Sequence, residues 1–106
     1  MIKKAATIAQ FAEMQTAHKK LLVDFFATWC GPCQRIGPVY TKYATDYKDK
    51  IAFAKVDVDE AGEVVDKFNI TSMPTFVAFK DGKEVSRIVG GDEQQLLNFI
   101  KNLDKL

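Results

Sequence analysis

Residues 21–33 read LLVDFFATWCGPC, and this segment carries the strongest structural signal in the chain. From Leu21 to Ala27 it is apolar on both faces except at Asp24, which is typical of a strand inside a sheet that is covered on both sides. Residues 34 to about 47 are then expected to form a helix, in which Pro38 removes a backbone hydrogen bond and kinks the axis. The segment therefore predicts a central strand that leads into a helix, with both cysteines at the junction.

The two cysteines, Cys30 and Cys33, are the only ones in the chain. A bridge between them would close a very short loop, and the entropic stabilisation from a disulfide grows with loop length, so this bridge would add little stability. A C-x-x-C pair of this kind indicates electron transfer through a reversible disulfide.

Cys30 is expected at or next to the N-cap of the helix, where unpaired backbone amides and the helix dipole favour the thiolate over the thiol. Cys33 then lies in the first turn on the same face, with its Cα about 5 Å from that of Cys30, which a disulfide accepts. We therefore expect Cys30 to attack a disulfide and Cys33, buried behind it, to resolve the resulting mixed disulfide.

The two residues between the cysteines affect how closely a partner protein can approach and whether the cysteine pair acts as a reductant or an oxidant. Gly31 lets the backbone of another protein come close, and Pro32 presets a helical φ without adding a donor. A histidine at the position of Pro32 could stabilise the thiolate and make the pair a stronger oxidant, so proline favours a reductant.

Length and composition indicate one domain over residues 1–106, with 47% apolar residues and 15 basic against 14 acidic side chains. The near-equal numbers of basic and acidic side chains argue against a surface that binds nucleic acid or a membrane. Zinc needs four ligands, whereas only His18 is available to join the cysteines, and it is expected to be solvated on a distant helix. No metal site is therefore predicted.

Targeting signals are not evident in the sequence. The apolar stretch after Lys3 and Lys4 stops at Ala9, short of the roughly 7 to 15 apolar residues of a signal peptide. Leu21–Ala27 is far shorter than the ~20 residues that span a bilayer. We expect a soluble cytoplasmic protein in a reducing compartment.

The rest of the chain alternates strands and helices. Thr7 and Gln10 form a capping box for a helix to about His18, with Ile8, Phe11 and Ala12 on one face. A short strand is expected before it, within Lys3–Thr7. Residues 51–58 are expected to form a strand and residues 63–68 a short helix.

The C-terminal part predicts a hairpin and a last helix. Asp81-Gly82 is a strong hairpin turn between two strand-like runs in residues 75–89. The last helix begins near Asp92, with Gln95 completing its cap and its apolar face formed by Leu96, Phe99, Ile100 and Leu103. The order β-α-β-α-β-α-β-β-α is typical of an α/β protein with a mixed sheet flanked by helices on both faces.

Asp24 is a carboxyl group inside an apolar strand, and burial disfavours its charged form and raises its pKa. Such a group can accept the proton of Cys33, through a water if needed, when Cys33 becomes a nucleophile. Lys55, in the neighbouring strand pattern, is its expected charge partner. The alternative is that Asp24 caps backbone at the sheet edge and that Lys55 is solvated.

Several motifs together resemble the thioredoxin family over the whole chain. They are Asp24 within Val23–Ala27, the pentapeptide Trp29–Cys33, Pro38, Lys55-Val56-Asp57, Met73-Pro74-Thr75 and Gly90. The resemblance implies a thioredoxin fold, with a central mixed five-stranded sheet flanked by four helices.

The resemblance also implies roles for individual residues. Cys30 would be the nucleophile and Cys33 the resolving thiol, with Asp24 and Lys55 as a buried proton relay. The Met73-Pro74 bond would be cis and lie beside the dithiol, and the Met73 backbone would pair with a substrate strand. The implied docking surface consists of Trp29, Gly31, Pro32, Met73, Pro74, Gly90 and Gly91.

By the same resemblance, the chain would be a general protein-disulfide reductase and a monomer without a bound cofactor. Its electrons would come from NADPH through thioredoxin reductase. Its partners would be oxidised proteins such as peroxiredoxins, methionine sulfoxide reductase and ribonucleotide reductase. Two alternatives remain open from the residues: a binding module whose dithiol is dispensable, and an oxidase or isomerase, which Pro32 disfavours.

Some positions depart from the commonest family pattern. Gln34-Arg35 stands where the family frequently has Lys-Met, and Phe26 stands where it frequently has Tyr or Trp. Gly37 and Gly91 each stand where the family frequently has alanine. We expect Arg35 to place a cation near the docking rim and so to affect which partners dock.

Overall fold

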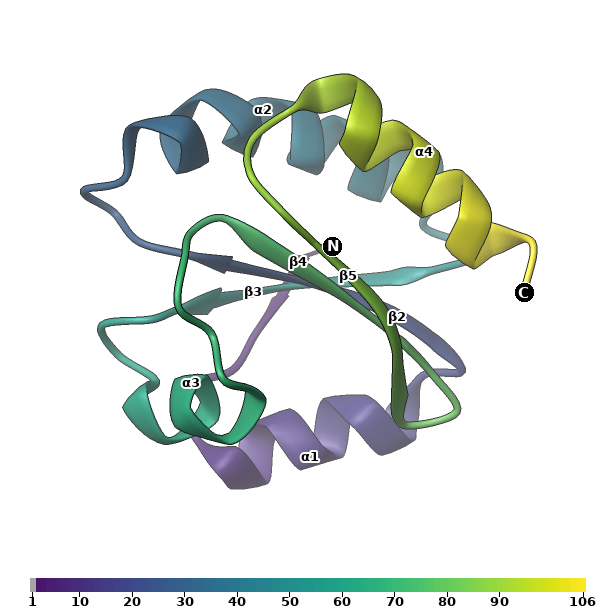
Figure 1. Ribbon diagram of the computed structural model, residues 1–106. Coiled ribbons are helices and arrows are strands. Elements are labelled where there is room, and N and C mark those ends of the chain that lie inside the picture. Colours follow the sequence, from purple (N-terminus) through teal and green to yellow (C-terminus); the bar gives the residue numbers. More distant parts are fainter. Residues whose placement is uncertain (1) are drawn as a thin grey trace.

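The computed structural model describes residues 2–106 and has five strands and four helices within them (Figure 1). In chain order they are β1 (Ile2–Lys4), α1 (Ile8–Ala17), β2 (Lys20–Phe26), α2 (Gly31–Asp46), β3 (Ala52–Asp57), α3 (Gly62–Phe68), β4 (Thr75–Lys80), β5 (Lys83–Val89) and α4 (Glu93–Asp104). The order of elements predicted from the sequence is confirmed.

All five strands form one mixed sheet in the order β1-β3-β2-β4-β5. β3 runs parallel to β1 and β2, whereas β4 runs antiparallel to both β2 and β5. Consequently β2 and β3 end at the edge of the sheet where β4 begins and β5 ends. The loops after these strands meet at that edge.

Two helices cover each face of the sheet, α1 and α3 on one side and α2 and α4 on the other (Figure 1). The alternation along β2 explains how both faces are filled: Leu21, Val23 and Phe25 pack toward α1 and α3, and Leu22 packs toward α2 and α4. Asp24 shares the face of Leu22, so a carboxyl group lies under α2. No helix among residues 2–106 is long and apolar enough to cross a membrane.

The prediction for the buried face of α1 was wrong at Ala12, which is exposed. Met14 is buried in its place, together with Phe11. Residues three apart share a helix face, whereas Ala12 is rotated by about 100° from Phe11. Ile8, Phe11 and Met14 therefore form the apolar stripe.

Two element boundaries also differ from the prediction. β1 ends at Lys4, because the Thr7 side chain is used to cap α1 and accepts a hydrogen bond of 3.1 Å from the Gln10 backbone amide. α2 begins at Gly31 and not at Gln34, because Cys30 itself is the N-cap. Pro32 fits this first turn since the missing amide would have no partner there.

Candidate active site

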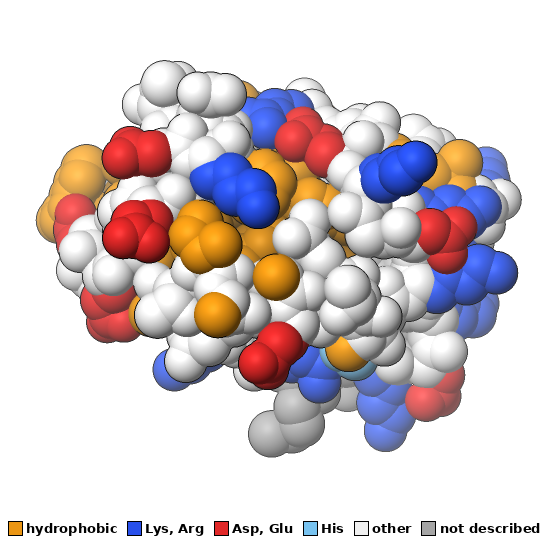
Figure 2. Space-filling model, turned by 90° about the horizontal axis from the view of Figure 1, so that it is seen from below, with side chains coloured by type: hydrophobic (Ala, Val, Ile, Leu, Met, Phe, Trp, Pro, Cys, Tyr) orange, Lys and Arg blue, Asp and Glu red, His pale blue; other side chains and the backbone are white. Residues whose placement is uncertain are grey.

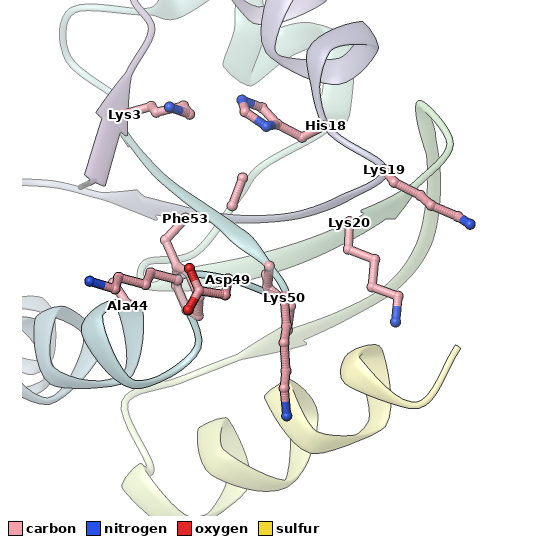
Figure 3. Close-up of a pocket in the computed structure, with 11 residues that line it drawn as sticks. Lys3, His18, Lys19, Lys20, Ala44, Asp49, Lys50 and Phe53 are labelled. Carbon is pink, nitrogen blue, oxygen red and sulfur yellow. The ribbon is translucent and has the colours of Figure 1, made fainter.

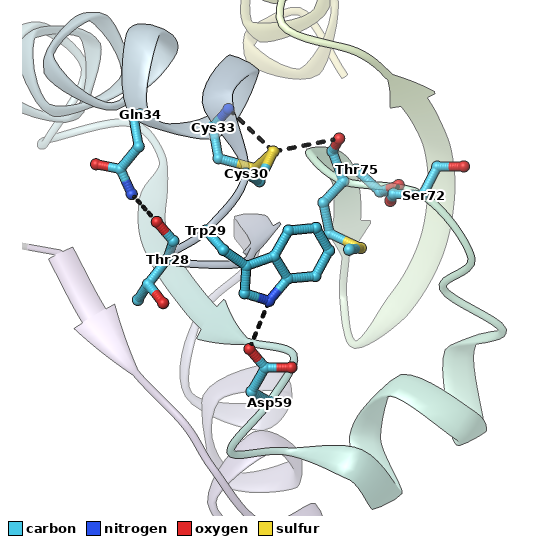
Figure 4. Close-up of a disulfide and its surroundings, with 9 residues drawn as sticks. Thr28, Trp29, Cys30, Cys33, Gln34, Asp59, Ser72 and Thr75 are labelled. Carbon is cyan, nitrogen blue, oxygen red and sulfur yellow. Dashed lines mark hydrogen bonds between the residues drawn. A yellow bond between two sulfur atoms is a disulfide. The ribbon is translucent and has the colours of Figure 1, made fainter.

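The turn between β2 and α2 places the cysteines at the sheet edge described above. The Cys30 amide donates to the Ala27 carbonyl at 3.2 Å, which closes the turn. The Gln34 side-chain amide donates to the Thr28 carbonyl at 2.8 Å, which ties the turn to α2 (Figure 4). These bonds hold the segment before the cysteines against the first turns of α2.

Cys30 and Cys33 form a disulfide in this structure, with their Cα atoms 5.2 Å apart. Both side chains are buried, and their sulfurs pack against Ala27. The Cys33 amide points at Cys30 Sγ at a distance of 3.2 Å (Figure 4). The helix N-terminus thus presents a backbone donor to the first sulfur, as the sequence predicts for a stabilised thiolate.

Trp29 lies beside the disulfide and is 68% exposed, which is unusual for the largest apolar side chain. Its indole Nε1 donates to Asp59 Oδ2 at 2.9 Å (Figure 4). Asp59 follows β3, and its own amide is held by Asp57 Oδ1 at 2.9 Å. The indole is therefore anchored at its polar end while its ring stays accessible.

Sequence reasoning missed Asp59. The signal was available, because parallel strands end at the same edge of a sheet, and Asp59 follows β3 as Trp29 follows β2. A carboxylate in that loop is a ready acceptor for an exposed indole N–H.

The peptide bond between Met73 and Pro74 is cis, as the family resemblance implies. The Met73 carbonyl oxygen lies 3.6 Å from Cys30 Sγ. The Pro74 carbonyl accepts a hydrogen bond of 2.9 Å from the Gly90 amide, which joins the start of β4 to the end of β5. Residues 73 and 74 therefore lie directly beside Cys30.

Gly91 lies against Pro32 in the first turn of α2. A Cβ atom added at Gly91 would be 3.2 Å from the Pro32 carbonyl oxygen and 3.3 Å from Pro32 Cβ. Absence of a side chain at Gly91 lets the loop before α4 approach the first turn of α2. The residues of the implied docking surface are thus found at one end of the sheet, around the disulfide. They are Trp29, Gly31, Pro32, Met73, Pro74, Gly90 and Gly91.

Asp24 is 1% exposed, and its Oδ1 atom has no hydrogen-bond partner. Burial raises the pKa of Asp24 from 3.8 to about 7, and the positive charge of Lys55 opposes this rise. Lys55 lies directly opposite Asp24 in the register of β2 and β3. Among residues 2–106 no ion pair joins the two, since Lys55 Nζ lies 4.5 Å from the centroid of the Phe26 ring.

In the described part of the chain, no three His, Cys, Asp or Glu side chains come together in a way that could hold a metal ion. His18 is half-buried near Lys3 at the opposite end of the sheet from the cysteines. Burial and the charge of Lys3 lower the pKa of His18.

A disulfide at a helix N-terminus, with the partly exposed Met73 next to its first sulfur and an exposed indole beside it, defines a thiol–disulfide oxidoreductase of the α/β class. The thioredoxin family model matches residues 3–102. The chain belongs to the thioredoxin family and is a general protein-disulfide reductase.

Known proteins resemble the chain along almost its full length. Thioredoxin 1 of Plasmodium falciparum is 44% identical over 101 residues, which are 95% of this chain and 96% of the relative. The oxidised form of mitochondrial thioredoxin 3 from Saccharomyces cerevisiae superposes with a TM-score of 0.90 at 39% identity. The match covers 95% of this chain and 94% of the yeast chain.

A third relative comes from structural work on thiol resolution in the yeast mitochondrial 1-Cys peroxiredoxin by glutathione and thioredoxin systems. That solved chain superposes with a TM-score of 0.90 at 38% identity, and the match covers 95% of this chain and 94% of the solved chain. Its similarity extends across the whole fold.

Proposed function

We propose that Cys30 is the nucleophile and Cys33 the resolving thiol of disulfide reduction. The Cys30 thiolate attacks one sulfur of a partner disulfide, the partner's S–S bond breaks, and the released sulfur takes up a proton. Cys33 then loses its proton and attacks Cys30 Sγ, which forms the Cys30–Cys33 disulfide and releases the second partner thiol. Two electrons pass from the protein to its partner, and of the two protons that the partner thiols take up, one is the proton lost by Cys33 and the other comes from solvent, because Cys30 starts as a thiolate.

The observation that carries this assignment is the hydrogen bond from the Cys33 amide to Cys30 Sγ. A backbone donor aimed at one sulfur stabilises negative charge there and makes it the better nucleophile and the better leaving group. Cys33 lies one turn inside the helix and receives no comparable support among the described residues.

We propose that Asp24 accepts the proton of Cys33, with Lys55 as its charge partner. A carboxyl group with a pKa of about 7 can be either protonated or ionised near neutral pH, which suits proton exchange. Lys55 favours the ionised form from its position across the strand pair, which supports a role in adjusting this balance.

The proposed docking surface consists of the residues that surround the disulfide. The backbone at Met73 would pair with an extended segment of the partner, and Pro74 would lie beneath that segment. Trp29, Gly31, Pro32, Gly90 and Gly91 would contact the partner on either side.

We further propose that residues 1–106 act as one domain and as a monomer, in the cytoplasm. No cofactor would be bound, and NADPH would supply electrons through a thioredoxin reductase. Peroxiredoxins, methionine sulfoxide reductase and ribonucleotide reductase are the proposed acceptors. The solved relative from the yeast peroxiredoxin work supports the first of these.

This electron route is tested by mixing the oxidised protein with NADPH, a thioredoxin reductase and a peroxiredoxin in its disulfide form. NADPH oxidation is expected to equal the sum of the peroxiredoxin disulfide and the protein's own disulfide, one NADPH for each, and Cys30→Ser in place of the wild type should support none. Absence of NADPH oxidation in the complete mixture would contradict the recycling step. Oxidation with insulin as acceptor, but none with peroxiredoxin, would contradict the choice of partner.

A further inference from the structure

The loops around the disulfide carry an excess of exposed carboxylates. Asp59 and Glu60 follow β3, Glu63 lies in the first turn of α3, and Asp92 and Glu93 begin α4. Figure 2 shows several acidic side chains together at one end of the face formed by α1 and α3 and most of the basic side chains toward the other end, with single acidic side chains between them. The formal net charge of only +1 therefore conceals a separation of charge.

These carboxylates flank the disulfide on two sides. On one side, Asp59 holds the indole of Trp29, which precedes Cys30. On the other side, Asp92 follows Gly91, which is packed against Pro32.

Nearby cations offset the field of these groups only in part: Lys4 and Lys55 line the same hollow as Glu60, and Lys67 lies one turn from Glu63 on α3. Within residues 2–106 the side chains of Glu60, Glu63 and Glu93 take part in no ion pair or hydrogen bond. Arg35 is the exposed cation closest to the cysteines in the chain, and Lys55 is half-buried against Phe26.

The opposite end of the sheet is basic. A hollow of about 260 Å³ there is lined by Lys3, His18, Lys19, Lys20, Lys48, Asp49 and Lys50 (Figure 3). Lys20 donates to the Asp104 carbonyl at 2.6 Å and Lys50 pairs with the Asp104 carboxylate at 3.7 Å, so α4 neutralises only part of this charge. The 16 residues of α2 separate the two ends by about 24 Å.

We propose that this charge separation makes the protein prefer partners whose reducible disulfide is flanked by lysine or arginine. A basic partner is attracted to the carboxylates beside Cys30 and repelled by the lysines at the far end. It therefore approaches the molecule at the dithiol, which raises the association rate more than the chemical rate. The inference rests on the proposed disulfide-reducing function and names the chemistry of its substrates.

The test uses peptide disulfides that differ only in their flanking residues, which are lysine, glutamate or serine. The second-order rate constant for reduction by the pre-reduced protein is measured by acid quench at ionic strengths from about 0.01 to 0.15 M. The lysine peptide should react about ten times faster than the glutamate peptide at low salt. This ratio should fall toward one as salt shortens the screening length to about 8 Å.

The carboxylates around the disulfide are tested with the triple variant Glu60→Gln, Glu63→Gln, Glu93→Gln, in which the ratio is expected to fall to about three or less at low salt. The matched control, Glu13→Gln, Asp46→Asn, Asp49→Asn, removes the same number of negative charges away from the disulfide. Because Asp49 lines the lysine-rich hollow, its loss makes the far end more basic, and the ratio should not fall. Equal rates for the two charged peptides, or equal loss of preference in both variants, would overturn the proposal. Failure to reduce even the serine peptide would instead contradict the proposed function.

Discussion

Replacing Cys30 with serine is expected to lower the rate of disulfide reduction by at least about a thousand-fold, because a hydroxyl does not ionise near neutral pH. Cys33 is expected to be a poor substitute, since it is buried and lies one turn inside α2. The bridge closes a loop of sequence separation 3, so its loss should change stability little and the variant should fold.

The measurement is insulin reduction with dithiothreitol as the electron source. Ser86→Ala, an exposed change on β5, is the control and should retain the wild-type rate. If Cys30→Ser matched the wild type, the dithiol would be dispensable and the protein would act as a binding module.

Asp24→Asn is expected to stabilise the oxidised protein above neutral pH. Because burial raises the pKa of Asp24 from 3.8 to about 7, the folded state holds a proton that the unfolded state has released between these values. The free energy of unfolding should therefore fall as pH rises from about 3.8 to about 7, by up to about 4 kcal/mol. Above that range both states are ionised at this position and the effect is constant.

Urea unfolding of the oxidised wild type and Asp24→Asn at pH values from about 4 to 8 measures this linkage. The variant should lose the fall in stability over the window and exceed the wild type by about 2 kcal/mol at the upper end. The gain stays below 4 kcal/mol because a buried asparagine also lacks partners. Identical pH dependence in the two proteins would contradict the raised pKa.

The same variant separates stability from chemistry. Asparagine cannot accept a proton, so the resolving attack by Cys33 should slow by about a hundred-fold, while attack by Cys30 should change much less. Rapid quench of the mixed disulfide measures the two steps separately. An unchanged resolving step would remove Asp24 from the proposed mechanism.

The sheet and its helices could be predicted because their signals are local. The Asp81-Gly82 turn lies between two strands, and the apolar stripe of α4 has the spacing of a helix. The expected N-cap at Cys30 is confirmed, and only the range of the helix, which was begun at residue 34, was three residues too short. The choice between Ala12 and Met14 depends on the direction from which the sheet meets α1.

Contacts across the sheet edge could not be predicted by local patterns. The bond between Trp29 and Asp59 joins two loops that are distant in sequence and become neighbours only when β2 pairs with β3. The position of Lys55 was expected beside Asp24, and the register places it there, but its ammonium group lies over Phe26. Side-chain direction depends on packing that residue spacing does not describe.

The most direct test of the proposed roles is to trap the mixed disulfide. Cys33→Ser and Cys30→Ser are each reduced, mixed with the same peptide disulfide, and analysed by mass spectrometry after acid quench. We predict a lasting adduct on Cys30 in Cys33→Ser and almost none on Cys33 in Cys30→Ser during the same time. Faster adduct formation on Cys33 than on Cys30 would contradict the assignment of Cys30 as the attacking thiol.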